Sequence, residues 1–224
     1  MDCSVPVDWP RQRRRGFTLI ELLVVMGVIA VLAMILLPVT LLARRHARDA
    51  SCRSNFRQLW YCVTQYANNQ NDLVPANLDT PLRISNVVYK NQRATGWGLL
   101  YPIFLNVPEL LFCPSDPARH VGWTYGWRNW GTADGEVQCS YGYRGGQNLV
   151  PDEKTPVTLS VIDAYPHRVF GAEYYEPFAS PARIHHPDHI NFLRCNGQVE
   201  HSLEIVSFGP TDGDFQAALD TLDR

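Results

Sequence analysis

The chain has 224 residues and a formal net charge of −2 at pH 7. Its length allows one domain, or a stalk with one modest domain, and its apolar content of 46% supplies enough side chains for a core. The charge argues against nucleic acid as a partner, because DNA-binding domains are normally basic, and six cysteines are too few for a disulfide-dense miniprotein of this length.

Residues 1–16, MDCSVPVDWPRQRRRG, are polar, contain two prolines and end in a cluster of arginines, so they imply no fold. The apolar segment FTLIELLVVMGVIAVLAMILLPVTLLA follows at residues 17–43. No charged residue occurs from Leu22 to Ala43, and a helix of this length spans the roughly 30 Å hydrocarbon core of a bilayer. A buried helix of a soluble protein is the alternative, but such helices seldom stay uncharged on every face.

Residues 44–71 continue the helix but change its character. Apolar side chains recur at helical spacing, namely Phe56, Leu59, Trp60, Val63 and Ala67, with Arg53, Arg57 and Gln65 between them. This pattern predicts an amphipathic helix that continues the apolar one. Three asparagines, at positions 68, 69 and 71, indicate where it ends.

Residues 72–224 form a β-rich globular part in which Pro and Gly are frequent and apolar runs are short. Five runs are predicted strands: 87–89, 158–162, 169–172, 189–193 and 199–203. Asn196-Gly197 stands between the last two and predicts a hairpin with a type I′ turn, because both residues tolerate positive φ. Residues 91–148 are expected to form long ordered loops.

Four tryptophans, Trp97, Trp123, Trp127 and Trp130, lie among glycines in the segment 91–148. Exposed Trp and Tyr side chains could stack on sugars, as on lectin-like surfaces. The alternative is that they belong to the core, and we expect the core.

The segment RRRGFTLIELLVVMGVIAVLAMILLP closely resembles the prepilin cleavage and methylation signal of type IV pilins and type II secretion pseudopilins. That signal has basic residues, then Gly, an aromatic first mature residue, Glu as the fifth mature residue, and a proline late in the apolar run. The matching residues here are Arg13 to Arg15, Gly16, Phe17, Glu21 and Pro38.

The resemblance implies that a prepilin peptidase/N-methyltransferase cuts between Gly16 and Phe17 and methylates the new Phe17 amine. It also implies that Glu21 neutralises the Phe17 amine of a neighbouring subunit. The residues agree with this implication: Gly16 has no side chain to hinder a protease, and an ionised carboxylate at Glu21 is costly in an apolar segment unless paired. The alternative is that Glu21 reaches the lipid headgroups near the helix start.

The expected fold is therefore α+β and pilin-like, with a long N-terminal helix whose first half is transmembrane, packed on a small antiparallel sheet with long loops. The expected function is that of a structural subunit, pseudopilin or pilin-like, in a type II secretion or type IV pilus-like system. Its expected partners are other pilin-like subunits, the inner-membrane platform and motor, and membrane lipid. The arginines before the apolar run predict a cytoplasmic N-terminus and a periplasmic globular part, anchored in a bacterial inner membrane.

The globular part carries a second resemblance, to bacterial pilin-like proteins with a His, nine residues and Asp-Gly near the C-terminus. Here His186, nine residues and Asn196-Gly197 have that spacing, with Asn replacing Asp. Such proteins often contain a Cys-Pro-Ser-Asp and a Ser-Tyr-Gly-Tyr segment, which occur here at residues 113–116 and 140–143. The role of that group is poorly defined, so this resemblance informs the fold more than the function.

Two sets of side chains suggest metals, although no obligatory cofactor is expected. His185, His186, His189 and His201, with Asp188, have the donor chemistry of a zinc site, but their spacing also suits histidines bonded to local backbone. Asp212 and Asp214 suggest calcium, which wants about six or more oxygen ligands, so an acidic surface turn is the simpler interpretation.

The cysteines permit a disulfide if the globular part faces an oxidising compartment. Cys52 and Cys62 lie too far apart on one helix to bridge each other. Cys113, Cys139 and Cys195 remain in the globular part, and among them Cys113–Cys139 is the expected pair. No G-x-S-x-G or phosphate-binding G-x-x-x-x-G-K motif is present, and no enzyme is expected. A surface-displayed carbohydrate- or ligand-binding module and a tethered metalloenzyme are the rival hypotheses.

Overall fold

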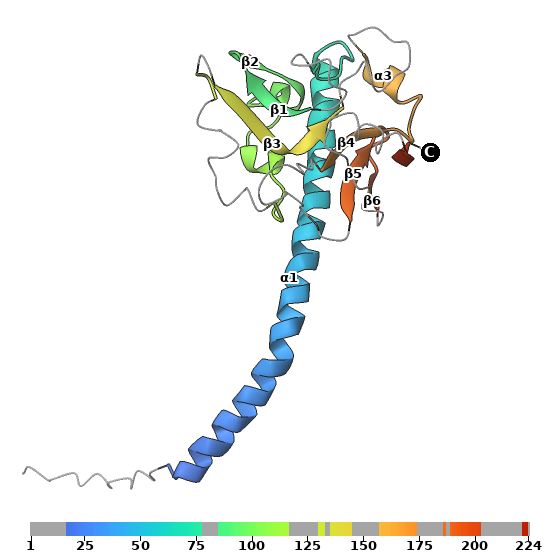
Figure 1. The fold of residues 1–224 in the computed structure, drawn as a ribbon. Helices are drawn as coiled ribbons and strands as arrows, with labels where there is room; N and C mark the ends of the chain where they lie inside the picture. Colours follow the sequence, from blue (N-terminus) through green and yellow to red (C-terminus); the bar gives the residue numbers. More distant parts are fainter. Residues whose placement is uncertain are drawn as a thin grey trace, which may run out of the picture. The chain divides into compact units, whose positions relative to one another are not determined.

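The computed structural model describes residues 17–77, 85–116, 130–132, 135–144, 157–173, 186, 189–202 and 221–223. The chain divides into two compact units, Met1–Arg44 and Arg45–Arg224. The first described element, helix α1 (Leu19–Asn69), contributes to both units (Figure 1). A long apolar N-terminal helix followed by an antiparallel sheet confirms the expected α+β, pilin-like fold.

Helix α1 ends where the asparagines predict. The backbone N–H of Asp72 donates to the Ala67 carbonyl at 2.8 Å, and Asn71 and Asp72 have positive φ values of 52° and 68°. Left-handed residues at a helix end let the chain turn back and satisfy the last carbonyls, and Asn and Asp tolerate that conformation better than most residues.

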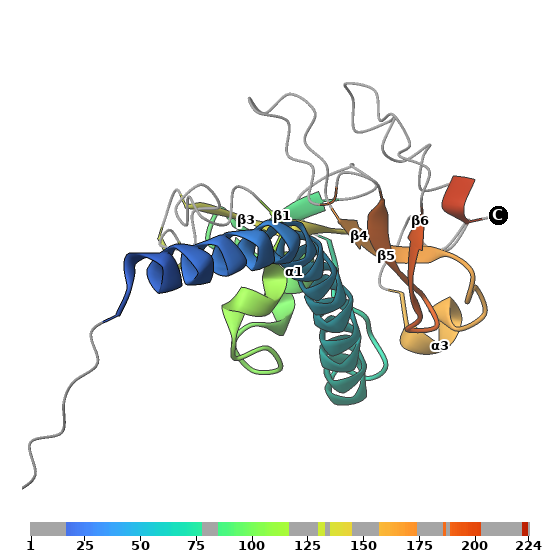
Figure 2. The same cartoon turned by 90° about the horizontal axis from the view of Figure 1, so that it is seen from below.

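Six strands form one antiparallel sheet in the order β2-β1-β3-β4-β5-β6 (Figures 1 and 2). The strands are β1 (Ser85–Lys90), β2 (Arg93–Ala94), β3 (Glu136–Tyr143), β4 (Val169–Glu173), β5 (Ile190–Arg194) and β6 (Val199–Ser202). β1, β4, β5 and β6 were predicted from their apolar runs. In the second unit the sheet lies along the C-terminal half of α1.

Two local predictions are wrong. The segment 158–162 was a predicted strand, but it forms a helical turn, α3 (Leu159–Ile162), because the Thr158 hydroxyl caps it by accepting a bond from Val161 N at 3.3 Å. The expected loops at 91–148 contain β2, the 3₁₀ turns η1 (Gly96–Leu100) and η2 (Pro108–Leu111), and the central strand β3. β3 mixes Gln, Ser and Gly with aromatic residues, so it lacks the apolar alternation that marks a strand.

The β5–β6 turn is not the predicted type I′ turn, which occurs instead between β1 and β2. Asn91 and Gln92, between β1 and β2, both have positive φ (51° and 63°), as a type I′ turn requires. In the β5–β6 hairpin only Gly197 has positive φ (80°), and its N–H donates to Arg194 O at 3.0 Å. The Asn-Gly hairpin is therefore confirmed, but its turn is the longer kind that ends in a left-handed glycine.

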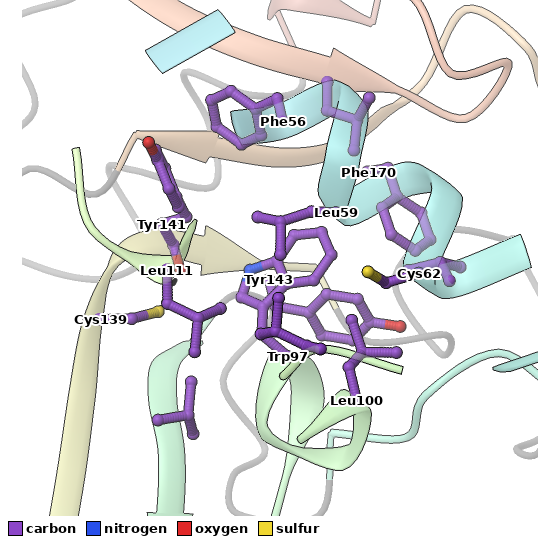
Figure 3. Packing of buried hydrophobic residues seen from close by; sticks show 14 of the residues in the cluster. Phe56, Leu59, Cys62, Trp97, Leu100, Leu111, Cys139, Tyr141, Tyr143 and Phe170 are labelled. Atoms are coloured by element: carbon purple, nitrogen blue, oxygen red, sulfur yellow. Dashed lines mark hydrogen bonds between the residues drawn. The ribbon is translucent and has the colours of Figure 1, made fainter. Parts of the chain in front are cut away.

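Aromatic side chains fill the core between α1 and the sheet (Figure 3). α1 contributes Phe56 and Leu59, both fully buried. Trp97, Tyr143 and Phe170 meet edge to face, with ring centroids 4.8, 5.2 and 5.7 Å apart. Burying each such side chain contributes about 1.5–3 kcal/mol, so this packing fixes the C-terminal half of α1 on the sheet. Trp97 is a core residue, as expected.

Candidate functional site

Thr18 and Glu21 form the N-terminal cap of α1. Glu21 Oε2 accepts hydrogen bonds from the Thr18 backbone N at 2.8 Å and from Thr18 Oγ1 at 2.9 Å, and Glu21 N donates to Thr18 Oγ1 at 3.3 Å. This reciprocal pattern is a capping box, which uses Ser or Thr at the cap and Glu or Gln three residues later. Phe17 is exposed just before the cap, and Gly16 lies outside the described residues. Glu21 therefore has a partner within its own chain, which we did not anticipate although Thr-x-x-Glu is visible in the sequence.

The apolar half of α1 is not covered by any part of the chain that the structure describes. Every side chain from residue 17 to residue 48 is exposed. Among the described residues, α1 is the one helix long and apolar enough to cross a membrane. An apolar surface of this extent requires lipid or other apolar helices around it.

Five polar side chains form a second candidate site, here named the His186 cluster. Its members are Asp49 of α1, Glu173 at the end of β4, His186, His189, and Asn191 of β5. Glu173, His186 and Asn191 are almost fully buried, with exposed fractions of 2%, 5% and 0%. Buried polar groups are costly unless they bond to one another, so this cluster requires a specific arrangement.

Asn191 joins the two carboxylates of the His186 cluster. Its Nδ2 donates to Asp49 Oδ1 at 2.8 Å and to Glu173 Oε1 at 3.2 Å, and its backbone N donates to Glu173 Oε2 at 2.9 Å. The two imidazoles face the same oxygens. His189 Nε2 lies 2.9 Å from Asp49 Oδ1, whereas His186 Nε2 lies 3.1 Å from Glu173 Oε1 and 4.0 Å from Asp49 Oδ1. The imidazole rings stack with centroids 4.6 Å apart.

The surroundings of Asp49 favour its ionised form. Burial alone would raise the pKa of Asp49. Hydrogen bonds from His189 and Asn191 and the charge of Arg53 together lower the pKa by more than burial raises it, so the pKa lies below the ordinary value of 3.8. Arg53 NH2 is 2.9 Å from Asp49 Oδ2, one helical turn away. Asp49 thus presents one oxygen to Arg53 and the other to the cluster.

Cys113 forms a disulfide with Cys52 of α1, with Cα atoms 5.3 Å apart. The predicted Cys113–Cys139 pair is therefore wrong. Cys139 is a buried free thiol whose Sγ lies 3.0 Å from the Tyr141 carbonyl oxygen. The predicted pair is wrong because only pairs within the globular part were considered. Packing brings Cys52 of α1 against Cys113, in the segment after η2. Cys62 and Cys195 are also buried and free.

The Cys-Pro-Ser-Asp and Ser-Tyr-Gly-Tyr segments meet in the structure. The Ser140 hydroxyl donates to the buried carboxylate of Asp116 at 2.7 Å. The Tyr141 hydroxyl accepts a bond from Asn55 Nδ2 at 3.3 Å and lies 3.6 Å from Cys52 Sγ. Both segments therefore anchor α1 and shape the core.

His186 and Gly197, nine residues and an asparagine apart, contact α1 at two places. His186 approaches Asp49, while Gly197 lies against the indole of Trp60. Asp49 and Trp60 are separated by about 16 Å along the helix axis. The residues between His186 and Gly197 include β5 and most of its turn, so this spacing lets the two ends of the motif reach two separate points on α1.

The metal candidates from the sequence are only partly brought together. His186 and His189 are neighbours, but His201 is exposed and its ring centroid lies 5.7 Å from that of His189. His185, Asp188, Asp212 and Asp214 lie outside the described residues.

Three members of the cluster, Asp49, Glu173 and Asn191, were not predicted from the sequence. Asp49 is three residues before Cys52 and seven before Phe56, so a carboxylate on the buried helical stripe was the available signal. Glu173 directly follows a predicted buried strand, where a charged residue calls for a partner. Asn191 has no such signal.

Residues 11–37 match the family described as the prokaryotic N-terminal methylation motif. No curated protein and no solved structure matches the chain. The matched motif supports a type IV pilin-like or pseudopilin subunit, with processing by a peptidase and assembly with other pilin subunits. It points to a structural subunit rather than an enzyme, and the apolar part of α1 is consistent with membrane anchoring.

Proposed function

We propose that this chain is a structural subunit of a type II secretion or type IV pilus-like system, cut between Gly16 and Phe17 and assembled through α1. The observation that carries the proposal is the methylation motif at residues 11–37, which includes the start of an apolar helix that the described residues leave uncovered. A signal cut before its apolar run leaves that run in the product. The mature chain then has a helix that can pack against lipid first and against other subunits later.

The precursor waits in the bacterial inner membrane, with its leader in the cytoplasm and its globular part in the periplasm. Four arginines in residues 11–15 favour this orientation, although Arg44, Arg45 and Arg48 on the far side reduce the bias. An oxidising periplasm suits the Cys52–Cys113 bridge. A membrane platform and cytoplasmic motor supply the work of extraction.

Cleavage changes the charge at the start of α1. It frees a positive amine at Phe17, four residues before the carboxylate of Glu21. The Thr18 capping bonds occupy one Glu21 oxygen, Oε2, so the other remains available to an amine from a neighbouring subunit. An amine–carboxylate pair between subunits removes the cost of placing both charges in an apolar filament core.

Assembly in a strain that expresses the chain together with a prepilin peptidase, platform and motor tests the proposal. Shearing or cross-linking should recover multimers joined through the apolar half of α1. A mature chain that stays monomeric in the membrane in the presence of the complete machinery would contradict a filament subunit.

A further inference from the structure

We infer that the His186 cluster is a binding site for one divalent transition-metal ion, with Asp49, His186 and His189 as ligands and Zn²⁺ as the ion of matching chemistry. The three ligand atoms, one from each residue, lie within 4.8 Å of one another. The site joins α1 to the start of β5 within the second compact unit.

The spacing of the ligand atoms fits a single ion. Zinc bonds to imidazole nitrogen and carboxylate oxygen are about 2.0–2.2 Å long, so neighbouring ligands of a tetrahedral ion lie about 3.3 Å apart. Asp49 Oδ1 is 2.9 Å from His189 Nε2 and 4.0 Å from His186 Nε2. Small side-chain adjustments of less than about 1 Å reach the tetrahedral spacing from both values.

Arg53 pairs with one oxygen of Asp49, Oδ2, and the other oxygen, Oδ1, faces the histidines. Asp49 and Glu173 direct oxygens at the same His186 nitrogen and share the same Asn191 amide. A neutral imidazole nitrogen can donate only one proton, so it cannot serve both carboxylates. A divalent ion between Asp49 and the two histidines would bind the Asp49 oxygen and both imidazole nitrogens at once.

The donor atoms select the class of metal. Two imidazole nitrogens and a carboxylate suit zinc and related transition metals, whereas calcium takes oxygen ligands. The sulfur of Cys113 lies 3.7 Å from His186 Nε2, but it is held in the disulfide, and only a thiolate binds metal well. Glu173 accepts hydrogen bonds from Asn191 through both carboxylate oxygens, so it acts as a positioning residue.

Asn191, which joins the two carboxylates, also carries an unsatisfied acceptor. Its Oδ1 is buried and has no hydrogen-bond partner within the described part of the chain. A buried acceptor without a donor costs about 1–3 kcal/mol.

The test uses the full chain in detergent, with the disulfide intact, stripped by a chelator and titrated with Zn²⁺. We expect one zinc per chain after dialysis and a rise in the unfolding midpoint, because an ion that binds only the folded state stabilises it. Co²⁺ in place of Zn²⁺ should give the visible bands of a tetrahedral nitrogen and oxygen site. No retained metal, or a sulfur-to-metal charge-transfer band, would overturn the assignment.

Variants separate ligands from neighbours. Asp49→Asn keeps the size of the side chain, and His189→Gln alters a partly exposed residue, so both should fold. Each should weaken zinc binding by more than the roughly 10–100-fold effect expected of a supporting residue. His201→Ala removes a nearby exposed histidine and should leave binding unchanged. Equal binding by Asp49→Asn and the unaltered chain, or an equal loss in His201→Ala, would refute the ligand set.

Discussion

Gly197 packs against the indole ring of Trp60, leaving no room for a side chain on the glycine. A Cβ at this position would lie 2.4 Å from Trp60 Nε1, and Gly197 has a φ of 80°. This contact explains why a glycine, rather than any turn residue, follows Asn196.

Gly197→Ala should destabilise the fold through backbone strain and through the clash with Trp60. Left-handed φ costs an ordinary residue roughly 1–2 kcal/mol, and displacing the indole adds to that. Gly131→Ala is the matched control, because Gly131 has a φ of 84° with nothing within 4 Å of an added Cβ. The unfolding midpoint should fall further in Gly197→Ala than in Gly131→Ala. Equal decreases would show that Trp60 does not constrain the turn.

Much of this fold can be predicted from the sequence, because the relevant signals are local. The uncharged segment, the amphipathic repeat with Phe56 and Leu59, and Asn196-Gly197 each act within a few residues. β3 could not be predicted in this way. Ser140 is tolerated in a buried strand only because Asp116, distant in sequence, accepts its hydrogen bond.

The candidate sites also divide into residues with a local sequence signal and residues that only packing brings together. Gly16, Phe17 and Glu21 lie within one short segment of the sequence, so the sequence alone identifies them as candidates. Asp49 and Glu173 come from separate elements, and only packing brings them to His186. Cys113 likewise finds Cys52 because α1 packs beside it, which no spacing rule within the globular part could indicate.

The disulfide assignment predicts a specific peptide map. Digestion without reductant should release a linked pair containing Cys52 and Cys113. A bridge closing a loop of this length, with a sequence separation of 61, contributes about 4 kcal/mol in the chain-entropy account. Reductant should therefore lower the unfolding midpoint of the unaltered chain but not that of Cys52→Ala/Cys113→Ala.

Cys139→Ser serves as the control for this map, because it should keep the same linked peptides. Burial raises the pKa of Cys139 and that of Cys195 to about 12, so neither thiol should react with alkylating reagents in the folded chain. A linked pair containing Cys139 would contradict the structure.

Asp72 predicts an acid-dependent contribution to stability. Hydrogen bonds from the Ser160 side chain and backbone hold the pKa of Asp72 below its ordinary value of 3.8. The contribution is therefore present above that ordinary value and is lost as the pH falls through the lower folded pKa. Asp72→Asn should have a lower unfolding midpoint than the unaltered chain at neutral pH, and the difference should shrink in acid. A difference independent of pH would exclude the carboxylate charge as its cause.

Glu21→Gln separates the two roles of Glu21. Glutamine preserves a capping box with Thr18, but it cannot neutralise a Phe17 amine. Removing one partner of a buried ion pair costs about 3–5 kcal/mol, so multimers should decrease strongly while the cleaved chain stays in the membrane. Thr18→Ala removes the cap and keeps the charge of Glu21. Its multimer level should therefore be closer to that of the unaltered chain than the level of Glu21→Gln is. The reverse ranking in a cross-linking assay would assign Glu21 to capping alone.

The central claim is tested most directly by the mass of the mature N-terminal peptide. The account predicts a chain that begins at Phe17, carries one methyl group on its α-amine and lacks residues 1–16. Gly16→Val should abolish this product, because a branched side chain hinders the approach of the peptidase. A mature chain that retains residues 1–16, or that begins beyond the apolar segment, would contradict the account.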